Sequence, residues 1–340
     1  MASYRDINYS IRPAKNIERK MLIEAFRRLS FIDDLKNYRY IGFGSTYFSD
    51  FELIHKELNI TNLISIEADL GSAPRFEFNR PYSCVNLKFD YSYNILPTLN
   101  YDTRDIIWLD YDGIFNKYML DDIDTVISNV KMGSVFLISL NVENPKLILC
   151  EDEKLDHQKR KEKTQKKLEE VNEILQGYLN ISDEISPLNI DNSIFKKWNF
   201  AKKCTQVIND QIHKSIQNRS SIEKNGLTYQ QLFNFHYADG SKMLTIGGIV
   251  FDNELVESVK NCHFDKLDFI RKGDEALEIN VPNLTFREIK YLNKYISLDD
   301  ITKFPKDVSG KTIDTIVPPK EIKMYHEIYR YFPTFSETSF

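Results

Sequence analysis

The sequence has 340 residues, of which 42% are hydrophobic and 28% charged, a composition typical of a globular chain that forms one large domain or two ordinary ones. Its formal net charge is −5, so a nucleic-acid partner is not expected and would need a local basic patch. The sequence contains no apolar run as long as a membrane span and no signal-peptide pattern, and its four cysteines lie far apart. We therefore expect a cytoplasmic protein with reduced thiols and no membrane partner.

The first predicted element is an amphipathic helix over residues 15–35. Apolar side chains recur in it at roughly helical spacing, at Ile17, Met21, Ile23, Phe26, Leu29 and Ile32. The lysines and arginines between them form a basic outer face, which we expect to be solvated.

Short apolar segments then alternate with helical ones. Strands are expected at residues 38–45, 62–69, 84–92, 105–113 and 133–143, and helices at 46–58 and 118–130. Continuous apolar strands separated by helices are typical of a parallel sheet that is covered on both faces. With right-handed crossovers, the predicted fold is an α/β domain with a doubly wound, mostly parallel sheet.

The rest of the chain is less regular. A charged helix at 151–179 is expected to expose its lysines, because acids are interleaved with them. Two short strands follow at 242–248 and 249–253, and residues 183–235 look helical and loop-like. The predicted division is an N-terminal helical segment (1–35), a ligand-binding core (36–145), a helical insertion (146–235), late strands that complete the sheet (236–254) and a C-terminal α+β extension (255–340).

Polar residues and glycines follow the predicted strands where each strand ends. Gly42, Gly44 and Ser45 end the first strand, Glu67 the second, Asp90 the third and Asp110 the fourth. Ligands of doubly wound sheets bind outside the carboxyl ends of the strands, so we expect these residues to share one site. The glycines would let the backbone approach a ligand, and Glu67 would accept hydrogen bonds from ribose hydroxyls. Asp90 would meet either an adenine amino group or a backbone turn.

The glycine pattern indicates which nucleotide would fit. Tyr47 stands where a dinucleotide fingerprint has its third glycine, which argues against a close pyrophosphate cradle and so against NAD or FAD. S-adenosylmethionine has no phosphate and needs a glycine turn, a ribose acid and an adenine-side acid. It is therefore the expected cofactor.

Several segments between Arg39 and Glu143 resemble motifs of the class I (Rossmann-type) S-adenosylmethionine-dependent methyltransferases, and more narrowly of bacterial proteins labelled as O-methyltransferases. They are "YIGFGS", "ISIEAD", "LKFDYS" and "IIWLDYDG". The last also resembles an element of cation-dependent catechol and caffeoyl-CoA O-methyltransferases, in which the first aspartate is a metal ligand. That resemblance implies a divalent cation at Asp110. The acid that usually precedes the first glycine is replaced by Tyr40, and the Asp-Asn pair of the metal-dependent family is absent.

Methyl transfer to a hydroxyl needs an aligned nucleophile and a group that takes its proton. Asp110 is the candidate catalytic residue. We expect only one of the two aspartates at this strand end to face the site, and Asp112 precedes Gly113 in a pair that commonly forms turns. Among the six histidines, His236 is the best placed for a catalytic role.

The methyl acceptor is not identified by the sequence, and other functions remain open. The main alternative is a catalytically silent Rossmann-type scaffold, which would bind a nucleotide or a protein partner in a bacterial complex, with antiviral defence as one setting. The insertion at 146–235 would contact that partner. A nucleic-acid methyltransferase is not expected, since "LDYDG" does not match the Asn/Asp-Pro-Pro-Tyr type of motif.

Overall fold

The computed structural model describes residues 12–144, 157–179, 195–223, 225–296 and 312–333. Its centre is an eight-stranded sheet with the order β3-β2-β1-β4-β5-β7-β6-β8. The strands are β1 Tyr38–Gly42, β2 Asn62–Ile66, β3 Val85–Lys88, β4 Arg104–Ile114, β5 Ser134–Asn141, β6 Thr228–Ala238, β7 Lys242–Phe251 and β8 Leu277–Ile279.

The first five strands are parallel, and β7 joins them antiparallel to β5. The chain runs outward from β1 to β3 and then returns to place β4 on the other side of β1, so the strand order reverses between β1 and β4. This confirms the predicted mostly parallel, doubly wound α/β sheet. Such a reversal is the place where open sheets of this kind hold their ligands.

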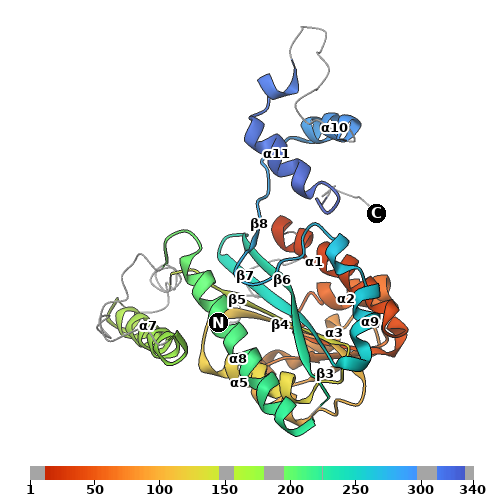
Figure 1. Ribbon diagram of the computed structural model, residues 1–340. Coiled ribbons are helices and arrows are strands. Elements are labelled where there is room, and N and C mark those ends of the chain that lie inside the picture. Colours follow the sequence, from red (N-terminus) through yellow and green to blue (C-terminus); the bar gives the residue numbers. More distant parts are fainter. Residues whose placement is uncertain (1–11, 145–156, 180–194, 224, 297–311, 334–340) are drawn as a thin grey trace.

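Helices cover both faces of the sheet (Figure 1). On one face, α1 (Pro13–Arg27), α2 (Ser49–Leu58) and α9 (Val256–Asn261) pack in one hydrophobic cluster. On the other, α5 (Lys117–Asn129) and α8 (Asn199–Glu223) pack in a second cluster. Successive side chains of β4 point to opposite faces of the sheet, so Trp108 packs in the first cluster and Leu109 in the second.

Local sequence explains several helix ends. Pro13 opens α1, where the missing N–H costs nothing, and Asn116 caps α5 by accepting hydrogen bonds from the N–H groups of Tyr118 and Met119. The short helices α3 (Ala73–Asn79) and α4 (Ser92–Ile95) follow β2 and β3. The helix α7 (His157–Leu179) exposes Lys159, Lys161, Lys163 and Lys166, as predicted.

At the C-terminal end, α10 (Phe286–Tyr295) and α11 (Pro319–Ile328) lie beyond β8 (Figure 1) and share a small hydrophobic cluster. The side chain of Thr285 accepts a hydrogen bond from the N–H of Glu288, and the Glu288 side chain accepts one from the N–H of Thr285. This capping box stabilises the start of α10. Within the described ranges, no helix combines the length and the apolar character that a membrane span requires.

Two predictions about elements are wrong. The strand β6 covers residues 228–235, which were predicted to be helix and loop, and the two short strands predicted after residue 242 are the single strand β7. Gly247 and Gly248 stand at the end of the first of these two predicted strands, but they lie in the middle of β7, where backbones approach closely. A Cβ atom on Gly247 would lie 2.2 Å from the carbonyl oxygen of Phe136.

Candidate functional site

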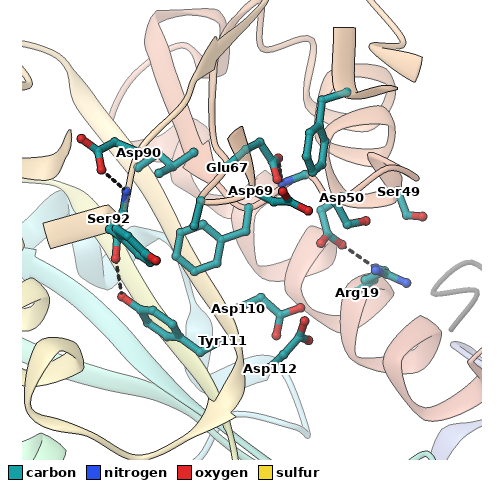
Figure 2. A pocket seen from close by; sticks show the side chains of 17 residues that line it. Arg19, Ser49, Asp50, Glu67, Asp69, Asp90, Ser92, Asp110, Tyr111 and Asp112 are labelled. Atoms are coloured by element: carbon teal, nitrogen blue, oxygen red, sulfur yellow. Dashed lines mark hydrogen bonds and ion pairs between the residues drawn. The ribbon is translucent and has the colours of Figure 1, made fainter. Parts of the chain in front are cut away.

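A pocket of about 570 Å³ opens at the carboxyl ends of β1 to β4, at the reversal of strand order (Figure 2). This volume is in the usual range for small-molecule sites. Its charged lining residues are six acids and one base: Asp50, Glu67, Asp69, Asp90, Asp110, Asp112 and Arg19. The strand-end residues Gly44, Ser45, Glu67, Asp90 and Asp110 all line it, whereas Gly42 is not among its lining residues.

The turn after β1 is shaped by packing around its two glycines. A Cβ atom on Gly42 would lie 2.7 Å from the Tyr40 hydroxyl oxygen, and one on Gly44 would lie 2.5 Å from ring carbons of Phe48. Neither glycine has a positive φ; Ser45 (φ 52°) and Phe48 (φ 48°) take the left-handed conformation instead. Gly42 therefore serves the close packing of the strand end, and Gly44 and Ser45 form the pocket wall.

Replacing Gly44 by alanine is expected to lower the free energy of unfolding by about 2 kcal/mol, because the added methyl group overpacks a buried turn. It would meet the Phe48 ring and lie 2.6 Å from the Ser65 hydroxyl oxygen. Urea unfolding measures the change. Gly71→Ala is the control, since its nearest new contact is at an ordinary 3.4 Å. Equal stability of the two variants would contradict the prediction.

Glu67 connects the ends of β1 and β2. Its Oε1 accepts hydrogen bonds from the N–H of Gly44 (2.8 Å) and from the Ser65 hydroxyl (2.6 Å). The side chain lines the pocket although the residue is only 6% exposed. Burial raises the pKa of Glu67 to about 7, against the opposing effect of these hydrogen bonds. Glu67 is therefore a carboxyl group that changes its charge near neutral pH.

Asp90 lies at the exposed rim of the pocket, after β3. Its Oδ1 accepts hydrogen bonds from the Asn94 side chain (3.0 Å) and the N–H of Tyr91 (2.7 Å), and these hydrogen bonds lower its pKa. The same rim carries a stack of aromatic rings. Tyr91 lies parallel to Tyr93 with 5.3 Å between centroids, and Tyr93 stacks on Tyr118 at 4.7 Å.

Asp110 and Asp112 both line the pocket, so the expectation that only one faces it is wrong (Figure 2). Side chains two residues apart in a strand project from the same face. The predicted turn at Asp112–Gly113 is also absent, because β4 continues to Ile114, with an irregular register after Asp110.

Lys15, on α1, forms an ion pair with Asp110. The Lys15 ammonium lies 2.9 Å from Asp110 Oδ2 and 2.8 Å from Glu18 Oε2, and it donates a hydrogen bond to the Tyr237 hydroxyl (3.2 Å). Burial alone would lower the pKa of Lys15, but the carboxylates of Asp110 and Glu18 outweigh burial and hold it well above its usual value. Lys15 therefore stays charged beside Asp110.

The charged residues on the inner face of α1 belong to the site but were not predicted from the sequence. Lys15, Glu18 and Arg19 are at most 6% exposed, so the expectation of a solvated basic face is wrong for these positions. Arg19 reaches the pocket and its Nε donates to Asp50 Oδ1 at 2.5 Å. Lys15, Glu18 and Arg19 have i, i+3, i+4 spacing, which places two basic groups and one acidic group on the same face of the helix. This spacing could have indicated a cluster of charges on that face.

Two further expectations are tested by position. The residues around Asp110 do not fit a divalent cation, because its Oδ2 already contacts the Lys15 ammonium group. The described part of the chain also has no cluster of three or more His, Cys, Asp or Glu side chains that could hold a metal.

His236 is not among the pocket's lining residues. It is buried beside the Trp198 ring, and burial lowers its pKa to about 4.

The sequence matches the model of a protein family described as "Putative O-methyltransferase" over residues 7–340. No curated protein matches the chain. Among solved structures, the chain is similar to Trm1 from Pyrococcus horikoshii in complex with S-adenosyl-L-methionine, with 9% identity, a TM-score of 0.41 and coverage of 72% of this chain and 57% of that chain.

It is also similar to the O-methyltransferase TomG from Streptomyces achromogenes, in complex with SAM, with 14% identity, a TM-score of 0.36 and coverage of 68% and 79%. A third structure is an O-methyltransferase family protein from Burkholderia thailandensis, with 8% identity, a TM-score of 0.32 and coverage of 71% and 57%. At these scores the roles of individual residues have to come from the geometry of the pocket itself.

Proposed function

The chain belongs to this O-methyltransferase family, and on that premise we propose that its pocket binds S-adenosylmethionine and transfers the methyl group to an oxygen atom of an acceptor. The observation that carries the proposal is the direct hydrogen bond between Glu67 and the N–H of Gly44. It joins the glycine turn to the acid that we propose binds the ribose, in one cleft at the reversal of strand order.

The charge of the pocket supports this ligand. S-adenosylmethionine carries a sulfonium, an ammonium and a carboxylate group, so it is a net cation, and six of the seven charged lining side chains are acids. Attraction between the sulfonium and these carboxylates favours the cofactor over its neutral product, S-adenosylhomocysteine. The same charges disfavour phosphates.

The rim suits the adenine ring. Tyr91 ends the stack of tyrosine rings, lines the pocket and is 54% exposed. A planar base can extend such a stack, with its amino group toward the fixed carboxylate of Asp90. Adenine at this rim and ribose at Glu67 leave the methyl group to be presented toward Asp110.

Asp110 is the proposed base for the acceptor hydroxyl. Its Oδ2 is held by Lys15, which fixes the carboxylate at the pocket wall. In-line transfer requires acceptor oxygen, methyl carbon and sulfur to be nearly collinear, and a fixed base on one side of that line supplies both orientation and proton removal. The acceptor is a small molecule or a macromolecule that can place a hydroxyl group in this pocket, beside Asp110.

Thermal unfolding with and without ligand tests the proposal. S-adenosylmethionine at 100 times its Kd is expected to stabilise the protein by about 2.7 kcal/mol, and NAD is expected not to. Glu67→Ala should abolish the shift, while Glu278→Ala, an exposed acid on β8, should keep it. No shift with S-adenosylmethionine or S-adenosylhomocysteine at millimolar concentration would overturn the proposal. Binding without turnover on any acceptor would favour the silent scaffold.

The cellular setting belongs to the same proposal: the cytoplasm of a bacterium, with a protein partner that contacts the segment 146–235. Free thiols support a reducing compartment, since Cys84, Cys204 and Cys262 form no disulfide. The exposed charges of α7 support a contact surface there.

A further inference from the structure

The outer face of α10 carries a stripe of positive charge. Arg287, Lys290 and Lys294 are exposed and follow i, i+3, i+7 spacing, which places them on one side of the helix over about 10 Å. The buried residue of this helix, Leu292, lies on the opposite side and packs in the cluster shared with α11. The one acid of α10, Glu288, is engaged in the capping box at the start of the helix. No acid therefore interrupts the stripe.

Aromatic rings flank this stripe on both sides. Phe286 is 60% exposed, and the Lys290 ammonium lies over its ring, 4.6 Å from the centroid. On the other side, the half-buried rings of Tyr291 and Tyr295 lie 5.0 Å apart. The Lys294 ammonium lies 5.3 Å from the centroid of Tyr295. The helix thus presents cations and aromatic rings side by side.

We propose that this face of α10 binds single-stranded nucleic acid. We call it the α10 surface, and it is formed by Phe286, Arg287, Lys290, Tyr291 and Lys294. Cations spaced along a helix can neutralise successive phosphates, and exposed rings can stack on bases of any sequence. Rings beside cations favour a nucleic acid over an acidic protein, because each nucleotide offers a stacking face next to its phosphate. The net charge of −5 is an average over the chain, whereas α10 has three basic residues and one acid.

The topology connects the α10 surface to the edge of the sheet at which the pocket opens. β8 is parallel to β6, β6 is antiparallel to β7, and β7 is antiparallel to β5. β8 therefore runs in the same direction as β4 and β5, and the chain leaves it at their carboxyl-end edge. From there α10 and α11 extend beyond β8 (Figure 1). The ion pair between Arg330 and Glu24 (3.1 Å) joins the end of α11 to α1, so a strand bound at α10 is held by the same body as the pocket.

Fluorescence anisotropy with labelled strands tests the proposal on the full chain. The probes are RNA and DNA of the same mixed sequence, about 12 nucleotides long, and both are expected to bind, because phosphates and bases are common to them. In Arg287→Gln/Lys290→Gln/Lys294→Gln, affinity at low salt should fall by roughly ten-fold or more. The slope of log K against log salt concentration should become less steep by about 2, the value for three phosphate contacts with a single strand. Phe286→Leu should weaken binding by roughly ten-fold and leave this slope unchanged.

Lys159→Gln/Lys161→Gln/Lys163→Gln is the matched control, since it removes the same charge from exposed positions of α7 and should keep affinity within about two-fold. A wild type that binds neither strand, or equal affinity of the α10 and α7 variants, would overturn the proposal. So would displacement of RNA by poly-L-glutamate at equal concentration of charges, which would indicate an acidic protein instead.

If the triple variant of α10 fails to fold, Phe286→Leu decides, and unchanged affinity in it overturns the proposal. The titrations contain no cofactor, so their failure leaves the proposed methyl transfer standing. A chain that binds both strands but shows no thermal shift with S-adenosylmethionine would refute the proposed function alone.

Discussion

Replacing Lys15 by methionine is expected to lower the free energy of unfolding by about 3–5 kcal/mol. Lys15 is 3% exposed, and its ammonium lies within 2.9 Å of the carboxylates of Asp110 and Glu18. Methionine is close to lysine in length, so the packing over the Trp108 ring, now 4.2 Å from the ammonium, changes little. In the variant a fully buried Glu18 and a partly buried Asp110 are left without their shared cation.

Urea unfolding of three variants separates charge from packing. Adding Glu18→Gln to Lys15→Met removes one of the two stranded carboxylates, so the double variant should recover about half of the loss. Lys20→Met, on the same helix and half-buried, is expected to change stability by less than about 1 kcal/mol. A loss of that small size in Lys15→Met, or a double variant less stable than the single one, would show that the ion cluster does not stabilise the fold.

The strand ends could be predicted from sequence because they depend on residues that are close together in the chain. Continuous apolar runs such as the one before Asp110 can only be buried strands or helices, and their length and flanking glycines indicate strands. Parallel strands then end at one edge of the sheet, which places Gly44, Glu67 and Asp90 together without knowledge of any contact. The hydrogen bond between Glu67 and the N–H of Gly44 is the outcome.

The buried charges of α1 could not be predicted in this way. A helical pattern assigns apolar side chains to the core and charged ones to solvent, and that rule fails where a partner from a distant segment neutralises the charge. Lys15 meets Asp110 and Arg19 meets Asp50, pairs that are distant in sequence and are neighbours only in the folded protein. Asp239, in the turn after β6, also accepts hydrogen bonds from the N–H groups of Ala14 and Lys15 and so fixes the start of α1.

The packing around glycines is a second feature that the sequence does not predict, since the same residue type permits close approach both after a strand and in the middle of one. At Gly44 the small residue lets the loop after β1 pack closely on the Phe48 ring and the Ser65 hydroxyl, and at Gly247 and Gly248 it permits close contact within the sheet. A Cβ atom on Gly248 would lie 2.1 Å from the carbonyl oxygen of Gln230. Sequence neighbours do not distinguish the two cases, because crowding atoms at each site belong to residues on other strands: Ser65 at Gly44, Phe136 at Gly247 and Gln230 at Gly248.

Glu67→Gln is expected to make the ligand-free protein more stable above pH 7 and a weaker binder of S-adenosylmethionine. Burial raises the pKa of Glu67 to about 7 in the folded protein, from 4.5 in the unfolded chain. Between these values the folded protein retains a proton that the unfolded chain releases, so the contribution of Glu67 to stability is present at low pH and is lost as pH rises through about 7. By linkage, the loss amounts to about 3 kcal/mol.

Glutamine is neutral at every pH and can still accept the hydrogen bonds from Gly44 and Ser65, so the variant should lack this loss. Its free energy of unfolding, measured in urea from pH 4 to pH 8, should equal that of the wild type near pH 4 and exceed it by about 3 kcal/mol near pH 8. Other groups titrate in both proteins, and the difference between the two curves isolates Glu67.

Binding should change in the opposite direction. The ionised carboxylate can accept hydrogen bonds from both ribose hydroxyls and attracts the cationic ligand, so wild-type affinity for S-adenosylmethionine should rise with pH through about 7. In Glu67→Gln the affinity should be roughly ten-fold lower at pH 8 and should not show this rise. Replacing a carboxyl group that stabilises the fold would lower the free energy of unfolding. Replacing one that serves ligand binding should raise the free energy of unfolding of the ligand-free protein and weaken binding. Opposite signs in the two measurements therefore identify Glu67 as part of the binding site, and equal pH dependence in both proteins would exclude it.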